Sequence, residues 1–190
     1  VLQDSNPVNA SLNGRVGFSG NPATNGGANC TSCHQTGAPL PTVSLQGPTS
    51  VIAGSTNLYT FTVSGGPGKT AGLDISTANN RGLLLPTSAD TQNLFNELTH
   101  SAPKAFSGGQ VQFLFSWTAP TFNDSVTMYG AGNSSDGQKS LSGDGIATTN
   151  LTIQVTGGTG TAPSASPTPP AATLGLERIV GGLNDLTNIT

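Results

Sequence analysis

The sequence predicts an all-β protein built as an antiparallel β-sandwich. Two observations support this: several short runs alternate apolar with polar residues, and clusters of Gly, Pro and Asn separate these runs. Alternation with a period of two places every second side chain on one face of a strand. Helical periodicity is nearly absent, and several short strands joined by turns are typical of a sandwich.

The predicted strands begin at about residue 42, and their apolar side chains define the face that should pack in the core. The clearest run covers 110–117, where aromatic residues alternate largely with glutamine and serine. The predicted core-facing residues are Val43 and Leu45; Tyr59, Phe61 and Val63; Leu73 and Ile75; Val111, Phe113, Phe115 and Trp117; Val126 and Met128; and Leu151, Ile153 and Val155.

Two other segments lack this alternation. Residues 91–98 are predicted as a short helix with Asp90 as its N-cap. Residues 1–41 contain Pro, Gly and Asn throughout and are predicted to be loop. Both cysteines of the chain lie in this loop segment, so we expect them on a loop or on a single helical turn.

We divide the chain into four parts. The N-terminal loop segment is 1–41 and the β-sandwich is 42–156. Residues 157–173 have the Gly, Thr, Pro and Ala content of a linker. Residues 174–190 are apolar again but too few to fold alone, so we expect them to dock as a strand or to begin a truncated next domain.

Composition and charge narrow the function. The chain has six Lys and Arg residues, scattered singly, and a net charge of −3, which argues against binding to nucleic acid. No run approaches the roughly 18 apolar residues that a bilayer-spanning helix needs, so we expect the protein not to span a membrane. The sequence begins at Val1, which fits a mature protein whose export peptide has been removed.

The most informative motif is C-x-x-C-H, formed by Cys30, Cys33 and His34. This motif is the attachment signature of c-type haem. Two thioether bonds would fix the porphyrin edge, and the adjacent imidazole would bind iron as the first axial ligand. We therefore predict one haem c, attached covalently through Cys30 and Cys33, with His34 as a metal ligand. Haem is attached to this motif outside the cytoplasm, so we expect an extracellular or cell-surface protein, with the periplasm as the alternative.

Two other chemistries use a C-x-x-C pair. A zinc site would need further Cys or His ligands, and His100 is the only other histidine. A redox dithiol usually opens a helix that follows a strand in a βαβ pattern, and no such pattern surrounds Cys30. Haem attachment is the interpretation that uses both cysteines and the adjoining histidine.

The second axial ligand is His100, Met128 or none. Met128 lies on the apolar face of a predicted strand, which favours core packing. His100 precedes a turn that contains proline, and we predict that it binds both the metal and the cofactor opposite His34. Bis-histidine ligation predicts a comparatively low potential. With both axial positions filled, reaction of small molecules at iron is blocked, so we expect electron transfer and no enzyme activity.

Other candidate residues have weaker support. Phe18 could pack on the porphyrin, and Arg81 or Lys104 could pair with its propionates. Residues 133–137 with Asp144 resemble part of a calcium loop. They lack its regular ligand spacing and its terminal Glu, so turn chemistry is the better interpretation.

Several short motifs accompany one another between about residues 15 and 156. They are Gly20-Asn21-Pro22 with 27–34, Thr99-His100-Ser101, Phe115-Ser116-Trp117-Thr118-Ala119-Pro120, 126–133, and Gly143-Asp144-Gly145-Ile146. Together they resemble the haem-bearing Reeler-like domains of exported bacterial proteins, often called choice-of-anchor domains. The resemblance implies an immunoglobulin-like β-sandwich on which the haem loop packs, with His100 near the metal.

The tail carries a second resemblance. Residues 176–190 are similar to the opening strand of the β-propeller in glucose/sorbosone-type quinone dehydrogenases. This similarity implies that the chain is the cytochrome portion of a longer protein, unless the tail has another use.

Three functional hypotheses follow. In the first, the protein is a monohaem cytochrome that passes electrons to redox partner proteins or extracellular acceptors. Its tail would add to the sheet of a neighbouring copy, giving a homo-oligomer or a filament lined by haems, a nanowire. In the second, the chain relays electrons from a quinone-dependent sugar dehydrogenase. In the third, it is a surface adhesion module in which haem is structural.

Overall fold

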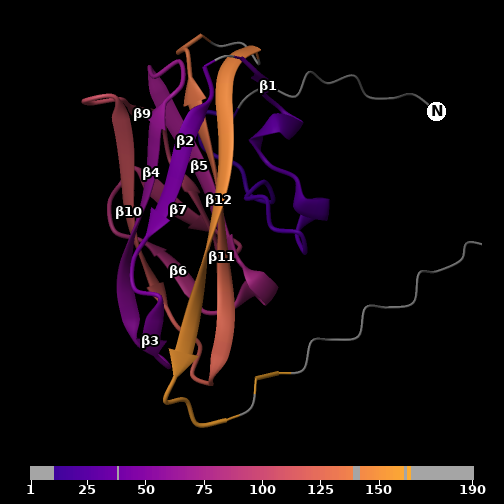
Figure 1. The fold of residues 1–190 in the computed structure, drawn as a ribbon, viewed down its shortest axis with the longest axis vertical. Coiled ribbons are helices and arrows are strands. Elements are labelled where there is room, and N and C mark those ends of the chain that lie inside the picture. The colour runs from indigo at the N-terminus through magenta and orange to yellow at the C-terminus, as the bar shows by residue number, and fades with distance from the viewer. Residues whose placement is uncertain (1–10, 38, 139–141, 161, 164–190) are drawn as a thin grey trace, which may run out of the picture.

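The computed structural model describes residues 11–37, 39–138, 142–160 and 162–163, and it consists of two packed β-sheets (Figure 1). The strands are β1 (Gln35–Thr36), β2 (Pro41–Gln46), β3 (Ser50–Ile52), β4 (Thr56–Gly65), β5 (Thr70–Thr77), β6 (Leu83–Pro86), β7 (Thr91–Leu94), β8 (Glu97–His100), β9 (Lys104–Ala105), β10 (Gln110–Thr118), β11 (Asp124–Ser135) and β12 (Ser142–Thr156). Three single-turn 3₁₀ helices are η1 (Asn25–Gly27), η2 (Cys30–Ser32) and η3 (Ala78–Asn80).

The larger sheet has eight strands and the smaller has four. The larger sheet follows the order β1-β12-β11-β5-β8-β7, with β3 beside β12 and β9 beside β5, and the smaller follows β2-β4-β10-β6. All pairings are antiparallel except the short contacts of β1 and β3 with β12. The prediction of an all-β, immunoglobulin-like β-sandwich is confirmed.

The predicted apolar faces meet between the two sheets. The aromatic residues of β4 and β10 form the centre, where the rings of Tyr59 and Phe115 stack at 5.9 Å and Trp117 meets Tyr59 edge-on at 6.2 Å. Met128 is fully buried in the same core, as predicted. A Cβ on Gly130 of β11 would lie 2.6 Å from a ring carbon of Phe61, so this close approach of the sheets requires glycine.

The predicted helix over 91–98 is wrong, because these residues form the β7–β8 hairpin. Phe95 and Asn96 make a two-residue turn with φ of +53° and +63°, the conformation of a type I′ hairpin. The Asn96 side chain accepts a hydrogen bond from the Leu84 N–H at 3.1 Å, which ties the turn to β6. A left-handed φ costs a residue such as phenylalanine about 1–2 kcal/mol, and Phe95 is 89 % exposed, so packing does not offset this cost.

The N-terminal segment adds a third layer on the outer face of the eight-stranded sheet, where Figure 1 shows it in indigo. Its backbone donates hydrogen bonds to two carboxylates of the sheet, from Phe18 to Asp74 at 2.7 Å and from Gly17 to Glu97 at 2.6 Å. The alternation of β5 explains this layer: its odd-numbered residues face the core, while Asp74 and Ser76 on the opposite face are buried beneath the segment.

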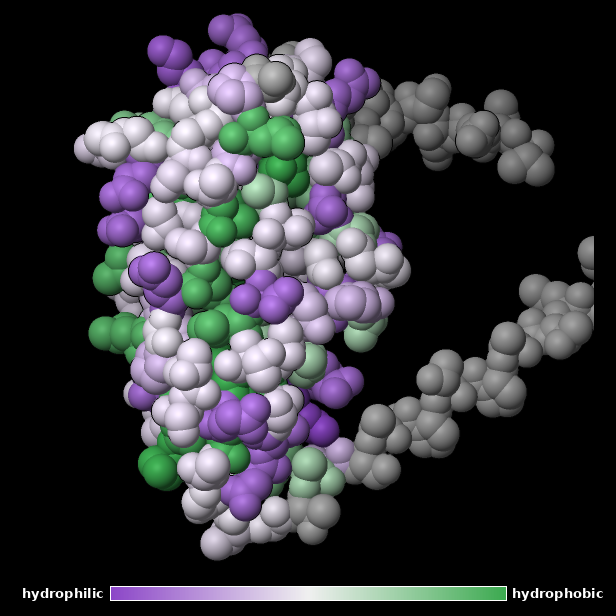
Figure 2. Space-filling view, in the orientation of Figure 1, coloured by the Kyte–Doolittle hydropathy of each residue, from purple (hydrophilic) through white to green (hydrophobic). Residues whose placement is uncertain are grey.

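The outer surface is polar and carries little charge. Figure 2 shows a largely pale and purple face on which hydrophobic residues appear as separate green spots. Within the described residues, no helix has both the length and the apolar character needed to cross a bilayer.

Candidate functional site

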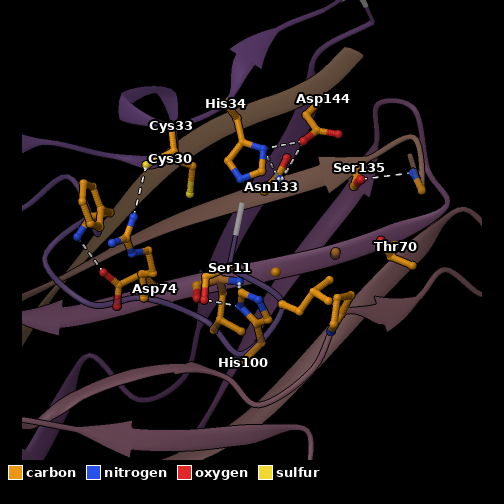
Figure 3. Close-up of a pocket in the computed structure, with 18 of the residues that line it drawn as sticks. Ser11, Cys30, Cys33, His34, Thr70, Asp74, His100, Asn133, Ser135 and Asp144 are labelled. Carbon is orange, nitrogen blue, oxygen red and sulfur yellow. Dashed lines mark hydrogen bonds and ion pairs between the residues drawn. The ribbon is translucent and has the colours of Figure 1, made fainter. Parts of the chain in front are cut away.

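A pocket of about 520 Å³ lies between the N-terminal segment and the outer face of the eight-stranded sheet. All four residues predicted to hold the cofactor, Cys30, Cys33, His34 and His100, line it. In Figure 3 the two imidazoles extend from opposite sides of the pocket, and the two cysteines lie beside His34. The structure therefore brings together residues that the sequence separates by 66 positions or more.

The C-x-x-C-H motif begins on the single helical turn η2, one of the two placements that the sequence left open. The Cys30 carbonyl accepts hydrogen bonds from the N–H groups of Cys33 at 3.2 Å and His34 at 2.9 Å. Asn29 begins the turn, because its side-chain oxygen accepts a hydrogen bond from the Thr31 N–H at 2.9 Å. Both thiols are free and present on one turn, as double attachment to a porphyrin requires.

The Cys30 thiol is unlike that of a redox dithiol. Burial, followed by the nearby Asp74 carboxylate, raises the pKa of Cys30 to about 12. Redox-active and zinc-binding cysteines need a thiolate, which a lowered pKa supplies. This environment therefore disfavours the redox-dithiol alternative.

His34 is oriented by a buried carboxylate. Its Nδ1 lies 2.5 Å from Oδ2 of Asp144, whose side chain is 1 % exposed. A carboxylate only accepts, so the proton of this hydrogen bond belongs to Nδ1 and the Nε2 lone pair is free. A carboxylate behind a ligating histidine fixes its tautomer and increases its basicity as a metal ligand. The Asn133 amide nitrogen lies 3.4 Å from the same two groups and completes the cluster.

His100 ends β8 on the opposite side of the pocket. Its Nδ1 lies 3.3 Å from the carbonyl oxygen and 3.2 Å from the amide nitrogen of Leu73. The Leu73 N–H donates to Nδ1 in one tautomer; in the other tautomer Nδ1 donates to the Leu73 carbonyl, and only that state leaves the Nε2 lone pair for a metal. Burial lowers the pKa of His100, backbone hydrogen bonds with Leu73 and Ser11 oppose that effect, and His34 adds a small decrease. The neutral imidazole that results is the form that binds metals.

Gly72 makes the room that His100 occupies. A Cβ at this position would lie 2.6 Å from Cε1 and 2.8 Å from Nδ1 of the imidazole. The absence of a side chain on β5 therefore sets the position of the ring. Leu12, Phe18 and Pro103 add apolar lining to the pocket. A pocket of this size with two opposed imidazoles and two adjacent thiols fits an iron porphyrin.

The structure places one of the three other residues proposed to contact the haem in the pocket and two outside it. Phe18 lines the pocket, as a residue that packs on a porphyrin would. Arg81 does not line it, and its Nε lies 3.1 Å from Oδ2 of Asp124. Lys104 is also outside the lining and pairs with Asp90, so neither cation is placed to meet a propionate. Both propionate assignments are corrected by this placement.

Several pocket residues have roles that the sequence did not indicate. Asp144, expected only in a turn, also contacts His34, which lies 110 positions away. Arg15 is a lining cation, and its Nη1 lies 3.9 Å from the sulfur of Cys33. Gly72 was likewise not singled out. No local pattern marks these residues, since contacts between segments that are distant in the sequence bring them to the pocket.

Asp74 forms a second polar feature of the pocket. It is 3 % exposed, and its Oδ1 is buried without a hydrogen-bond partner among the described atoms. Burial, together with the neighbouring Glu97 carboxylate, raises the pKa of Asp74 well above 3.8. The folded protein therefore holds this proton more tightly than the unfolded chain does. Stability should fall as pH rises from 3.8 through the raised value.

We predict that Asp74→Asn stabilises the protein at pH 7, because the amide removes a carboxyl group whose ionisation burial disfavours. The amide oxygen can still accept from the Phe18 N–H, and the amide nitrogen replaces the retained proton. Denaturant unfolding at several pH values measures the effect. Asp90→Asn is a control for which we expect the opposite change in stability. Burial acts to raise the pKa of Asp90, but hydrogen bonds from Lys104 and Ser88 lower it. Removing this carboxylate should therefore destabilise the protein at pH 7. Equal or lower stability of Asp74→Asn at pH 7 would contradict this prediction.

No protein-family model matches the chain, and no curated protein matches it. Among solved structures, the chain is similar to the CARDB domain of the PF1109 protein from Pyrococcus furiosus, crystallised in complex with di-metal ions. The two are 16 % identical, the match covers 63 % of this chain and 97 % of that chain, and the TM-score is 0.35. Within the described residues of this chain, no group of three or more His, Cys, Asp or Glu side chains is arranged to hold a metal ion.

Proposed function

We propose that this protein is an exported monohaem c-type cytochrome that transfers electrons. One haem c would be attached through Cys30 and Cys33 and held between His34 and His100. The observation that carries the proposal is the single pocket in which both thiols, the adjacent imidazole and the opposing imidazole meet. Bound there, haem would supply one-electron exchange at iron.

The protein residues support this function in two ways. Asp144 accepts from Nδ1 of His34, so that Nε2 can face the pocket, and the Leu73 backbone contacts Nδ1 of His100, which would present Nε2 in the tautomer that donates to the Leu73 carbonyl. Leu12, Phe18 and Pro103 supply apolar lining that would contact the porphyrin. Ligands fixed in advance need little rearrangement when the charge of the site changes, which suits electron transfer. Two nitrogen ligands also favour a lower potential than a methionine–histidine pair.

A redox titration tests this function. The chain would be produced in a periplasm that contains a haem c maturation system, and its absorption spectrum followed against applied potential. We expect one reversible one-electron transition and no binding of carbon monoxide to the reduced protein. A haem that does not cycle reversibly, or that binds carbon monoxide readily, would overturn the proposal.

The proposal includes self-assembly of the protein into an oligomer or filament through its tail. Residues 174–190 and most of the predicted linker 157–173 lie outside the described residues. Electron microscopy of native material would detect a filament, and a monodisperse monomer would argue against one. Quinone-dependent sugar oxidation would instead favour the relay alternative, and a redox-inert haem the adhesion alternative.

A further inference from the structure

We infer that a groove beside the β7–β8 hairpin is a saccharide-binding site that is independent of haem. The groove has a volume of about 410 Å³, and Thr24, Asn79, Asn80, Phe95 and Glu97 are among its lining residues. It lies between the N-terminal segment and the hairpin tip, and it shares no lining residue with the haem pocket.

Phe95 provides an aromatic platform that the fold itself does not use. Its side chain is 89 % exposed, the largest exposure among the exposed large hydrophobic residues, although its backbone has a left-handed φ of +53°. Asparagine or glycine would suit this position better. A strained, exposed aromatic residue contributes nothing to the core, so its presence points to a binding role.

Hydrogen bonds of Asn96 hold this platform in place. Its amide nitrogen donates to the Asn80 side chain at 2.8 Å and to the Gly82 carbonyl at 2.9 Å, and its backbone N–H donates to the Asn93 side chain at 3.2 Å. The hairpin tip and η3 therefore form one unit. Phe95 and the η3 amides keep a fixed relation to each other, and such preorganisation lowers the entropic cost of binding.

The amides of η3 supply hydrogen-bonding groups. Asn79 and Asn80 both have a left-handed backbone and exposed side chains. The Asn79 side chain is exposed and makes no hydrogen bond among the described residues, so both its donor and its acceptor are available. An amide can donate to one hydroxyl and accept from another, which matches neighbouring hydroxyls on a sugar ring.

The combination favours a saccharide over a protein partner. A pyranose ring presents C–H groups on one face and hydroxyls around its rim, so it can stack on a phenyl ring while it bonds to amides. A protein interface would instead centre on several buried apolar anchors. Among the described residues, Phe95 is the only large apolar residue that lines this groove. Within the described part of the chain, Glu97 is the one carboxyl residue that lines the groove, whereas most glycosidases use two, so we infer binding without hydrolysis.

The test uses the full chain and three neutral oligosaccharides: cellohexaose, chitohexaose and isomaltohexaose. Calorimetric titration of the unmodified protein should detect binding of at least one of them. Phe95→Asn should weaken that binding about tenfold or more. The same variant should unfold at an equal or higher temperature, because asparagine tolerates the left-handed turn. Loss of binding would then not arise from loss of the fold.

Leu58→Asn is the matched control, because Leu58 is 64 % exposed on β4 and does not line the groove. Its binding should equal that of the unmodified protein. The inference is overturned if none of the three saccharides binds, if Phe95→Asn binds as tightly as the unmodified protein, or if Leu58→Asn weakens binding equally. Since the groove needs no haem, the result does not depend on the proposed function.

Discussion

His100→Ala is expected to convert a six-coordinate, low-spin haem into a five-coordinate, high-spin haem that binds carbon monoxide when reduced. The two thioethers and His34 would keep the haem in place, so the change would be confined to the opposite axial position. The pocket supports this expectation because, among the described residues, His100 supplies the imidazole that lines it on the side opposite His34. Optical absorption and carbon monoxide titration measure the change.

Two further variants sharpen this test. Met128→Leu should leave the spectrum unchanged, because Met128 is fully buried in the core between the sheets. Gly72→Ala retains the histidine but places a Cβ against its ring, so we expect a partial shift toward the high-spin form. A low-spin spectrum that survives His100→Ala, or one that is lost in Met128→Leu, would contradict the assignment of His100.

Asp144→Asn is expected to raise the midpoint potential of the haem. The amide oxygen can still accept the Nδ1 proton of His34, but without a full negative charge it makes the imidazole a weaker donor to oxidised iron. Replacing a group that orients a metal-bound histidine typically weakens metal binding at least tenfold. A tenfold weakening confined to the oxidised state corresponds to roughly 60 mV for one electron. Spectroelectrochemical titration measures this shift.

Asp136→Asn is the matched control, because it removes the same charge from a neighbouring residue. The Asp136 side chain accepts a hydrogen bond from the Gln138 N–H and has no contact with His34 among the described interactions. Its potential should change much less than that of Asp144→Asn. Equal shifts in the two variants would show that overall charge, and not the bond between Asp144 and His34, sets the potential.

The fold was largely predictable because the sandwich depends on a local signal. Alternation with a period of two requires only neighbouring residues, and the predicted aromatic faces of β4 and β10 are buried as expected. The helix predicted for 91–98 was wrong for a physical reason. Its asparagine side chains stabilise a tight turn, and pairing with β5 supplies hydrogen bonds that a helix would otherwise make within itself.

The candidate site was predictable only where neighbouring residues form a recognisable motif. The C-x-x-C-H turn is such a motif, and the scarcity of histidine singled out His100. Asp144 and Gly72 belong to no such motif. Asp144 reaches His34 because β12 and the N-terminal segment lie side by side, and Gly72 matters only because the His100 ring lies against it. Both relations depend on pairings between distant segments.

The central claim is that Cys30 and Cys33 carry a haem. Intact mass measurement of the denatured chain, isolated from cells that mature c-type cytochromes, tests it most directly. We predict the mass of the chain plus one haem for the unmodified protein, and of the chain alone for a Cys30→Ala, Cys33→Ala double variant. An unmodified protein that has only the mass of the chain, or that mass less two hydrogens for a disulfide, would contradict the claim.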